Sequence, residues 1–207
     1  MINFTCIVDT CSFVNLTLFE FNRGTLLDLL KEKVNIKYSP EVNSIEIPKH
    51  SNDLMLSSET RMNFIHRTKK YTFPEYERRL FGENIQRENG DKGEKDNLSV
   101  ILDLYLTKQT KGLIYLTDDY KAIRNILSPQ IKAFPLYQIW NSFDVIIFLY
   151  IDHKIFSKEL AIAALKQLNS ELTVDDPKMS KSKTKLVQER LETYFEKIEI
   201  ISKILNK

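Results

Sequence analysis

The chain has 207 residues, of which 43% are hydrophobic and 28% are charged, and its formal net charge is +2. This length and balance fit one sizeable α/β domain with an appendage, and they exclude a chain that is disordered along its whole length. Because the net charge is small, attraction for a polyanion would depend on local basic patches.

The sequence shows no segment typical of secretion or membrane insertion. Its first residues lack the basic head and long apolar stretch of a secretory signal. The longest apolar run, residues 145–151, falls far short of the roughly 20 residues that span a bilayer. Cys6 and Cys11 have neither metal-ligand spacing nor a disulfide framework around them. We therefore expect a protein of the reducing cytoplasm with no membrane partner.

The N-terminal part of the chain predicts alternating strands and helices. An apolar run that ends at Asp9 is typical of a strand buried on both faces of a parallel sheet. Ser12 is suited to cap the next helix, and Gly24 marks a break between two helices. Residues 39–41 have the composition of a helix start, and Pro48 is expected to end that helix. The expected strands are 4–8 and 34–38, and the expected helices are 13–20, 24–32 and 39–48.

The rest of the chain continues the alternation after a mostly polar stretch. Residues 51–92 are predicted to form an inserted helical lid. Strands alternating with helices indicate a parallel, wound sheet and therefore the α/β class. The further strands are expected at 113–116 and 131–137, and the further helices at 94–106, 120–127, 138–151 and 157–169.

The C-terminal end is predicted to be separate from this domain, which covers residues 1–172. The polar, basic stretch 173–185 is expected to be a linker. The last helix, 186–207, carries apolar residues in alternating steps of four and three, as in a coiled-coil seam. It could form a homodimer, but folding back on its own core is at least as well supported.

Acidic residues follow or precede the predicted core strands. Asp9 comes directly after one predicted strand and Asp118 follows a second, so both carboxylates should emerge at the carboxyl edge of the sheet, where ligands bind in such folds. Glu94 and Asp96 lie in the first turn of the helix before the second strand, where the helix dipole favours negative charge. Glu46, late in its short helix, could complete the ring.

Such a ring of acids points to a metal ion. Carboxylates about 4 Å apart repel by roughly 4 kcal/mol per pair at an effective dielectric constant of 20. A divalent cation offsets this repulsion, and ligation by oxygen alone suits Mg²⁺ or Mn²⁺, which bind a phosphodiester and lower the pKa of an attacking water. The acids therefore predict hydrolytic cleavage of nucleic acid.

Taken in order, these motifs resemble the PIN-domain nucleases. Residues 7–13 look like the family's opening strand, which ends in Asp and is followed by an apolar helix. Residues 93–96 are similar to the Gly-Glu-x-acid helix start of one branch, and 116–124 to its strand, acidic pair and helix with Ala and Arg. Weaker similarity extends to residues 156–159, so the resemblance covers most of residues 2–170.

The resemblance implies a PIN-like three-layer fold with a central parallel sheet, and a Mg²⁺- or Mn²⁺-dependent endoribonuclease. Ser12 or Thr10 would orient water or substrate. Asp96 and Asp119 would support the metal site. The catalytic acids would be Asp9, Glu46, Glu94 and Asp118. Together the implied metal ligands are Asp9, Glu46, Glu94, Asp96, Asp118 and Asp119.

Some details of the resemblance leave alternatives open. Glu41 is the alternative to Glu46 as the early helical acid. The family's small-residue turn after the next strand is replaced near residues 138–140, and the predicted lid is longer than usual. These two differences affect the pocket wall and the access of substrate.

The partners are less specified than the chemistry. Arg67, Lys69 and Lys70 lie among aromatic residues, which suits single-stranded RNA, although an ordinary charged surface explains them equally well. The resemblance also permits the toxin of a toxin and antitoxin pair. The competing hypothesis is a PIN-like module with little catalysis that works in RNA binding or protein assembly.

Taken alone, Asp118 is more simply explained as a helix cap.

Two other phosphate-handling classes are disfavoured by the sequence. The run Asp9-Thr10-Cys11 lacks the second Asp of an Asp-x-Asp phosphatase, and none of the five glycines has the spacing of a P-loop.

Overall fold

The protein is described by a computed structural model that covers residues 4–18, 20–21, 24–49, 92–108, 110, 112–124, 137–151, 155–174 and 181–205. The expected lid, apart from Lys92, lies outside the described residues, and so do Arg67, Lys69 and Lys70. The chain divides into two compact units, Met1–Asn141 and Ser142–Lys207. The domain boundaries expected from the sequence stay predictions.

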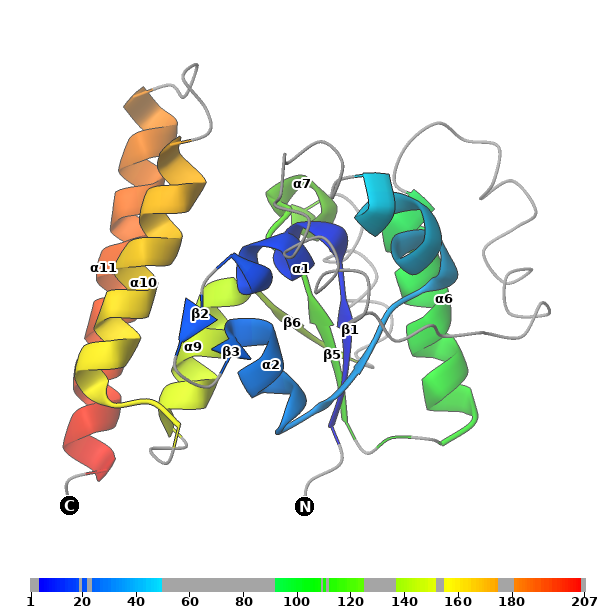
Figure 1. Ribbon diagram of the computed structural model, residues 1–207, viewed down its shortest axis with the longest axis horizontal. Coiled ribbons are helices and arrows are strands. Elements are labelled where there is room, and N and C mark those ends of the chain that lie inside the picture. Colours follow the sequence, from blue (N-terminus) through cyan, green and yellow to red (C-terminus); the bar gives the residue numbers. More distant parts are fainter. Residues whose placement is uncertain are drawn as a thin grey trace. The chain divides into compact units, whose positions relative to one another are not determined.

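A four-stranded parallel sheet forms the centre of the first unit (Figure 1). Its order is β4-β1-β5-β6, and every neighbouring pair is parallel. This confirms the predicted α/β class and the parallel sheet. The strands are β1 (Phe4–Val8), β4 (Asn35–Lys37), β5 (Gly112–Leu116) and β6 (Gln138–Trp140).

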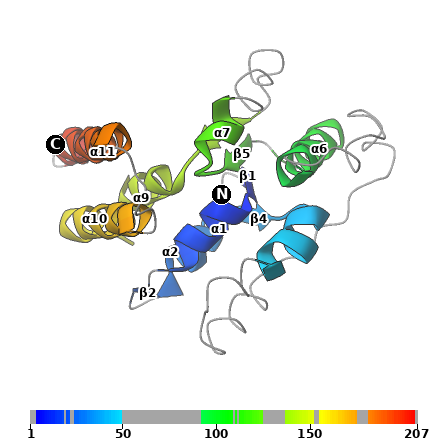
Figure 2. The same ribbon diagram turned by 90° about the horizontal axis from the view of Figure 1, so that it is seen from above.

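Helices flank both faces of this sheet. Figure 2 shows α1 (Thr10–Thr17) and α2 (Leu26–Lys31) on one side and α6 (Lys92–Leu106) on the other. Burial on both faces explains why β1 and β5 are nearly continuous apolar runs.

The core between the sheet and α6 is one cluster of buried side chains. Alternate residues of a strand face opposite sides of a sheet, and Ile7 of β1 pairs with Tyr115 of β5 on the side of α6. Leu98, Ile101 and Leu104 of α6 belong to the same buried cluster. The helix is therefore held against the sheet by apolar contacts along its length.

The connection from β1 into α1 differs in one detail from the prediction. Asp9 has the extended backbone of a helix N-cap, and its carbonyl accepts a hydrogen bond from Phe13 N at 2.9 Å. Ser12 therefore lies inside α1, and the prediction that it caps the helix is wrong. Only Asp9 lies between the end of β1 and the start of α1, so Asp9 takes the cap position.

The segments after α1 complete this side of the unit. A short antiparallel pair, β2 (Glu20–Phe21) and β3 (Gly24–Thr25), precedes α2. After β4 the backbone is helical over residues 40–49 and includes the π-helical turn η1 (Val42–Glu46). This helix continues through Pro48, so the prediction that Pro48 ends it is wrong.

The edge strand lies where a helix was expected. The sequence predicts a helix over residues 138–151, but residues 138–140 form β6, and the next helix begins at Ser142. Pairing with Ile114–Leu116 of β5 decides this position, and such pairing is not visible in the local apolar pattern. The short helix α7 (Tyr120–Ala122) follows β5. Residues 125–136 lie outside the described part, and so does most of the strand expected at 131–137.

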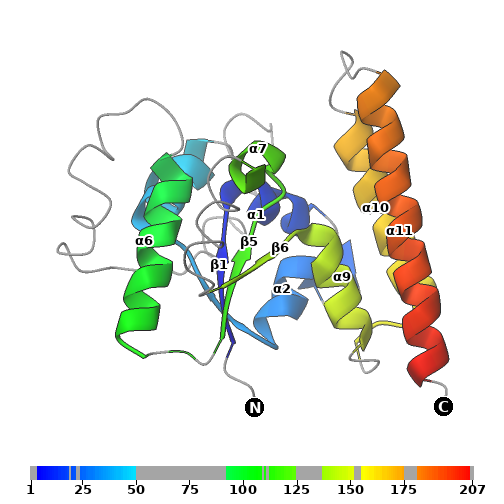
Figure 3. The same cartoon turned by 180° about the vertical axis from the view of Figure 1, so that it is seen from behind.

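The second unit includes three described helices, α9 (Ser142–Ile151), α10 (Lys158–Val174) and α11 (Lys181–Leu205). Figure 3 shows α10 and α11 side by side, and an ion pair of 2.7 Å between Lys158 and Glu199 joins the start of one to the end of the other. Both ends of the stretch expected as a linker, 173–185, are helical, because α10 ends at Val174 and α11 begins at Lys181. No helix in the described residues is long and apolar enough to cross a membrane.

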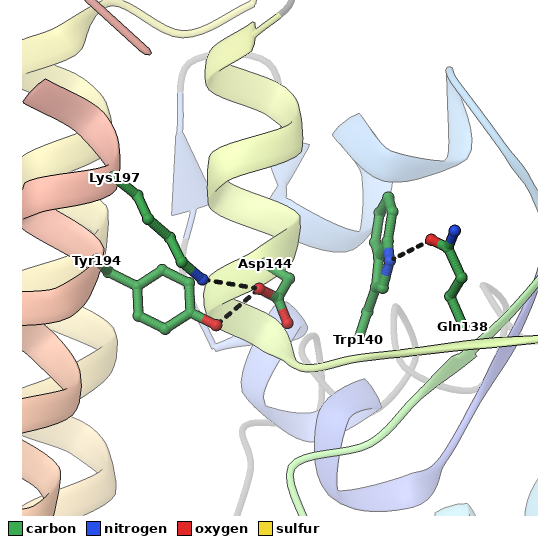
Figure 4. Close-up of polar contacts among 5 residues, drawn as sticks. All are labelled: Gln138, Trp140, Asp144, Tyr194 and Lys197. Carbon is green, nitrogen blue, oxygen red and sulfur yellow. Dashed lines mark hydrogen bonds and ion pairs between the residues drawn. The ribbon is translucent and has the colours of Figure 1, made fainter. Parts of the chain in front are cut away.

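The apolar stripe of α11 packs within its own unit. Leu191, Tyr194 and Ile198 are buried, and the ring of Tyr194 lies 5.1 Å from that of Phe143 in α9. The Tyr194 hydroxyl donates to Asp144 Oδ1 at 2.7 Å (Figure 4). The helix therefore folds back on its own chain, and a homodimer stays a prediction.

Candidate active site

Two of the predicted acids lie at the carboxyl ends of neighbouring strands. Asp9 follows β1, and its backbone N–H donates to Leu116 O of β5 at 2.9 Å. Asp118 comes two residues after the end of β5. Because β1 and β5 are parallel neighbours, both acids lie at the same edge of the sheet. The side chain of Asp9 is buried there, and Asp118 is half-buried.

Neutral donors hold the carboxylate of Asp9. Its Oδ2 accepts hydrogen bonds from Thr117 Oγ1 at 2.8 Å and from Cys11 Sγ at 3.2 Å. Burial raises the pKa of Asp9 above its ordinary value, and these two bonds offset part of that rise. The nearby charge of Glu46 raises the Asp9 pKa further. Asp9 is therefore a carboxyl group whose ionised form is costly in this environment.

Helix α1 holds Asp118. Ser12 Oγ and Asn15 Nδ2 both donate to Asp118 Oδ2, at 2.8 Å and 2.9 Å. Residues three apart lie on the same face of a helix, which explains how both reach one oxygen. The Asp118 backbone N–H also donates to Cys11 Sγ at 3.3 Å. One face of α1 therefore fixes the orientation of this acid.

Glu46 reaches the same region from η1. Thr10 Oγ1 donates to Glu46 Oε2, which places this carboxylate beside the start of α1. The first turn of α6 also approaches it, because a Cβ added at Gly93 would lie 2.6 Å from Glu46 Oε2. The absence of a side chain at Gly93 therefore leaves the space that the Glu46 carboxylate occupies. Glu46 contacts the residue that follows Asp9, and the choice of Glu46 over Glu41 as the early acid stays a prediction.

The other predicted acids have different surroundings. Glu94 is half-buried in the first turn of α6, and its charge helps to raise the pKa of the Tyr115 phenol. Asp96 Oδ2 accepts a hydrogen bond from the Glu41 backbone N–H at 2.9 Å. Asp119 is the N-cap of α7, and its Oδ1 accepts from the backbone N–H of the second helical residue at 2.7 Å. Asp96 and Asp119 thus each have a structural role that needs no metal.

Sequence reasoning missed the residues that support the acids. Cys11, Asn15 and Thr117 all bind Asp9 or Asp118. Asn15 was detectable in principle, because it lies one turn after Ser12 on the same face of a helix. Cys11 and Thr117 offered no such signal, because they meet across 106 positions of sequence.

The donor chemistry of the cluster suits a hard divalent cation. Carboxylate oxygens are the ligands that Mg²⁺ and Mn²⁺ prefer. Within the described chain, no Lys or Arg forms an ion pair with Asp9 or Glu46. However, no three His, Cys, Asp or Glu side chains of the described residues lie close enough together to hold a metal ion as they stand. The acids therefore have the ligand chemistry that a divalent cation needs, but their side chains lie too far apart to hold one as they stand.

Comparisons with known proteins give no match: no family model matches the chain, and no curated protein or solved structure does.

The chemistry of the cluster follows from its own residues. A carboxylate has about four lone-pair sites on its two oxygens, so one that is held by neutral donors keeps the capacity to bind a cation. A cation bound there would polarise a phosphodiester and activate a water for hydrolysis.

Proposed function

We propose that this protein is a Mg²⁺- or Mn²⁺-dependent endoribonuclease of the PIN-domain type that hydrolyses phosphodiester bonds in single-stranded RNA. One observation carries the proposal. Asp9, Glu46 and Asp118 come from three separate segments to one edge of the sheet, where neutral donors hold each of them. The motifs that resemble PIN-domain nucleases supply the same acids.

The electrostatics of Asp9 support a cation at this edge. A buried charge without a partner of opposite sign is unfavourable. When one partner of a buried ion pair is removed, for example, the charge left behind typically costs about 3–5 kcal/mol. Asp9 is 4% exposed and has another acid nearby, and both conditions raise its pKa. A divalent cation would favour the ionised form of Asp9 and would offset its repulsion with Glu46.

The residues around the acids would keep the site in shape. Glu46 and Glu94 would hold the metal together with Asp9 and Asp118. The ion, when bound, would supply a Lewis acid and an activated water. Hydrogen bonds from outside the ligand set usually orient ligands and tune affinity, which is the role we assign to the donors of α1 and to Thr117.

The open arrangement of the acids favours a second candidate function. A PIN-like module with little catalysis, which binds RNA or assembles with a protein, would not need three convergent ligands, and the described residues hold no such group. An antitoxin would be one such protein partner. Metal affinity separates the two candidates, because the nuclease requires the side chains to close around an ion and the module does not.

The experiment uses end-labelled single-stranded RNA with and without Mn²⁺. The test variant is the double change Asp9→Asn and Asp118→Asn, which keeps shape and removes charge. The control is Asp144→Asn, an acid of the second unit that accepts a bond from Tyr194. Metal-dependent cutting by wild type and control, but not by the double variant, would support the nuclease. Equal inactivity of all three, without metal binding, would favour the module.

A further inference from the structure

A buried amide lies one turn after Glu94 on α6. Asn97 is fully buried, and its Nδ2 donates to the Tyr115 hydroxyl oxygen at 3.1 Å. Its Oδ1 is also buried and has no hydrogen-bond partner within the described part of the chain. An acceptor buried without a partner costs about 1–3 kcal/mol, and in native proteins it often marks a water or an ion.

Tyr115 places this amide near the acids. It pairs across the sheet with Ile7, two residues before Asp9. It also lies three residues before Asp118, which follows the end of the same strand. Burial raises the pKa of its phenol well above the ordinary value, and the charges of Asp9 and Glu94 raise it further. The hydroxyl that holds Asn97 therefore lies within electrostatic reach of two of the proposed ligands, Asp9 and Glu94.

We propose that Asn97 is a further residue of the metal site, and that its amide oxygen faces the ion from the α6 side while Tyr115 holds the amide in place. This inference rests on the proposed function. An amide oxygen is a common ligand of hard cations, either directly or through a bound water. Because it is neutral, it adds a ligand without adding to the repulsion among the acids.

The test measures Mn²⁺ affinity in the absence of RNA, by calorimetric titration. Asn97→Leu removes the oxygen and should weaken binding about 10- to 100-fold. Asn97→Asp keeps an oxygen and adds a charge, so it should bind Mn²⁺ at least as tightly as wild type. Asn169, in the second unit, also has a buried Oδ1 without a partner among the described residues, and Asn169→Asp should leave the affinity unchanged.

Tyr115→Phe provides a second variant in case Asn97→Leu does not fold. It removes only the hydroxyl that anchors Asn97, and it should weaken Mn²⁺ binding severalfold. Tyr38→Phe is its control, because Tyr38 is equally buried but packs against Phe13 on the other face of the sheet.

The outcomes separate this inference from the proposed function. Wild-type affinity in a folded Asn97→Leu protein would overturn the inference alone, and so would wild-type affinity in Tyr115→Phe if Asn97→Leu does not fold. Weak binding by Asn97→Asp, to the level of Asn97→Leu, would also overturn it. Absence of Mn²⁺ binding by wild type would overturn the proposed function as well.

Discussion

Gly93→Ala would move Glu46 without changing its chemistry. The added Cβ would lie 2.7 Å from Glu46 Cδ, whereas carbon atoms in contact are about 3.5 Å apart or more, so the carboxyl group must move by about 0.8 Å. Metal-ligand distances are held to within about 0.2 Å. We therefore expect Mn²⁺ affinity to fall about 10- to 100-fold. Because alanine favours helix over glycine by up to about 1 kcal/mol, metal-free stability should change little.

Calorimetric titration with Mn²⁺ measures the first effect, and urea unfolding in chelator measures the second. Gly112→Ala is the matched control, because its added Cβ would meet the ring of Phe4 and none of the acids. It should lower stability and leave the Mn²⁺ affinity of the folded protein unchanged. Wild-type affinity in a folded Gly93→Ala protein would refute the placement of Glu46 at the metal.

Three further predictions concern stability. Tyr38→Phe should keep or raise the free energy of unfolding in urea, by up to about 1 kcal/mol, since the Tyr38 hydroxyl is buried without a partner among the described residues; a clear loss would contradict this. Burial raises the pKa of Asp9 above its ordinary value of 3.8, so the folded state holds this proton more tightly than the unfolded state does. The free energy of unfolding of the metal-free wild type should therefore fall as pH rises from about 4 toward the raised pKa, and Asp9→Asn should lack this fall. Equal pH profiles of the two proteins would contradict this. Tyr194→Phe should lower stability by about 1 kcal/mol, and an unchanged melting temperature would show that its bond to Asp144 contributes nothing.

The sequence was informative where burial leaves a local pattern. The runs that became β1 and β5 are apolar on both faces, and an acid after each run marks the edge of a parallel sheet. That pattern was enough to place Asp9 and Asp118 together. The helix α6 was equally visible, because its apolar residues repeat with helical spacing.

Features that depend on distant contacts could not be predicted. β6 has only three residues, and its pairing with β5 decides where it lies. The bonds from Ser12 and Asn15 to Asp118 join residues more than 100 positions apart. Ser12 resembled a helix cap by local rules, yet its hydroxyl serves a tertiary contact.

The most direct test of the metal site is the position of a bound ion. Crystals grown with Mn²⁺ would show the ion as an anomalous scattering peak. We predict one peak at the carboxyl edge of the sheet, in contact with Asp9 and Asp118, and its loss in the Asp9→Asn variant. A peak elsewhere, or RNA cutting by a protein that shows no ion at this edge, would contradict the account.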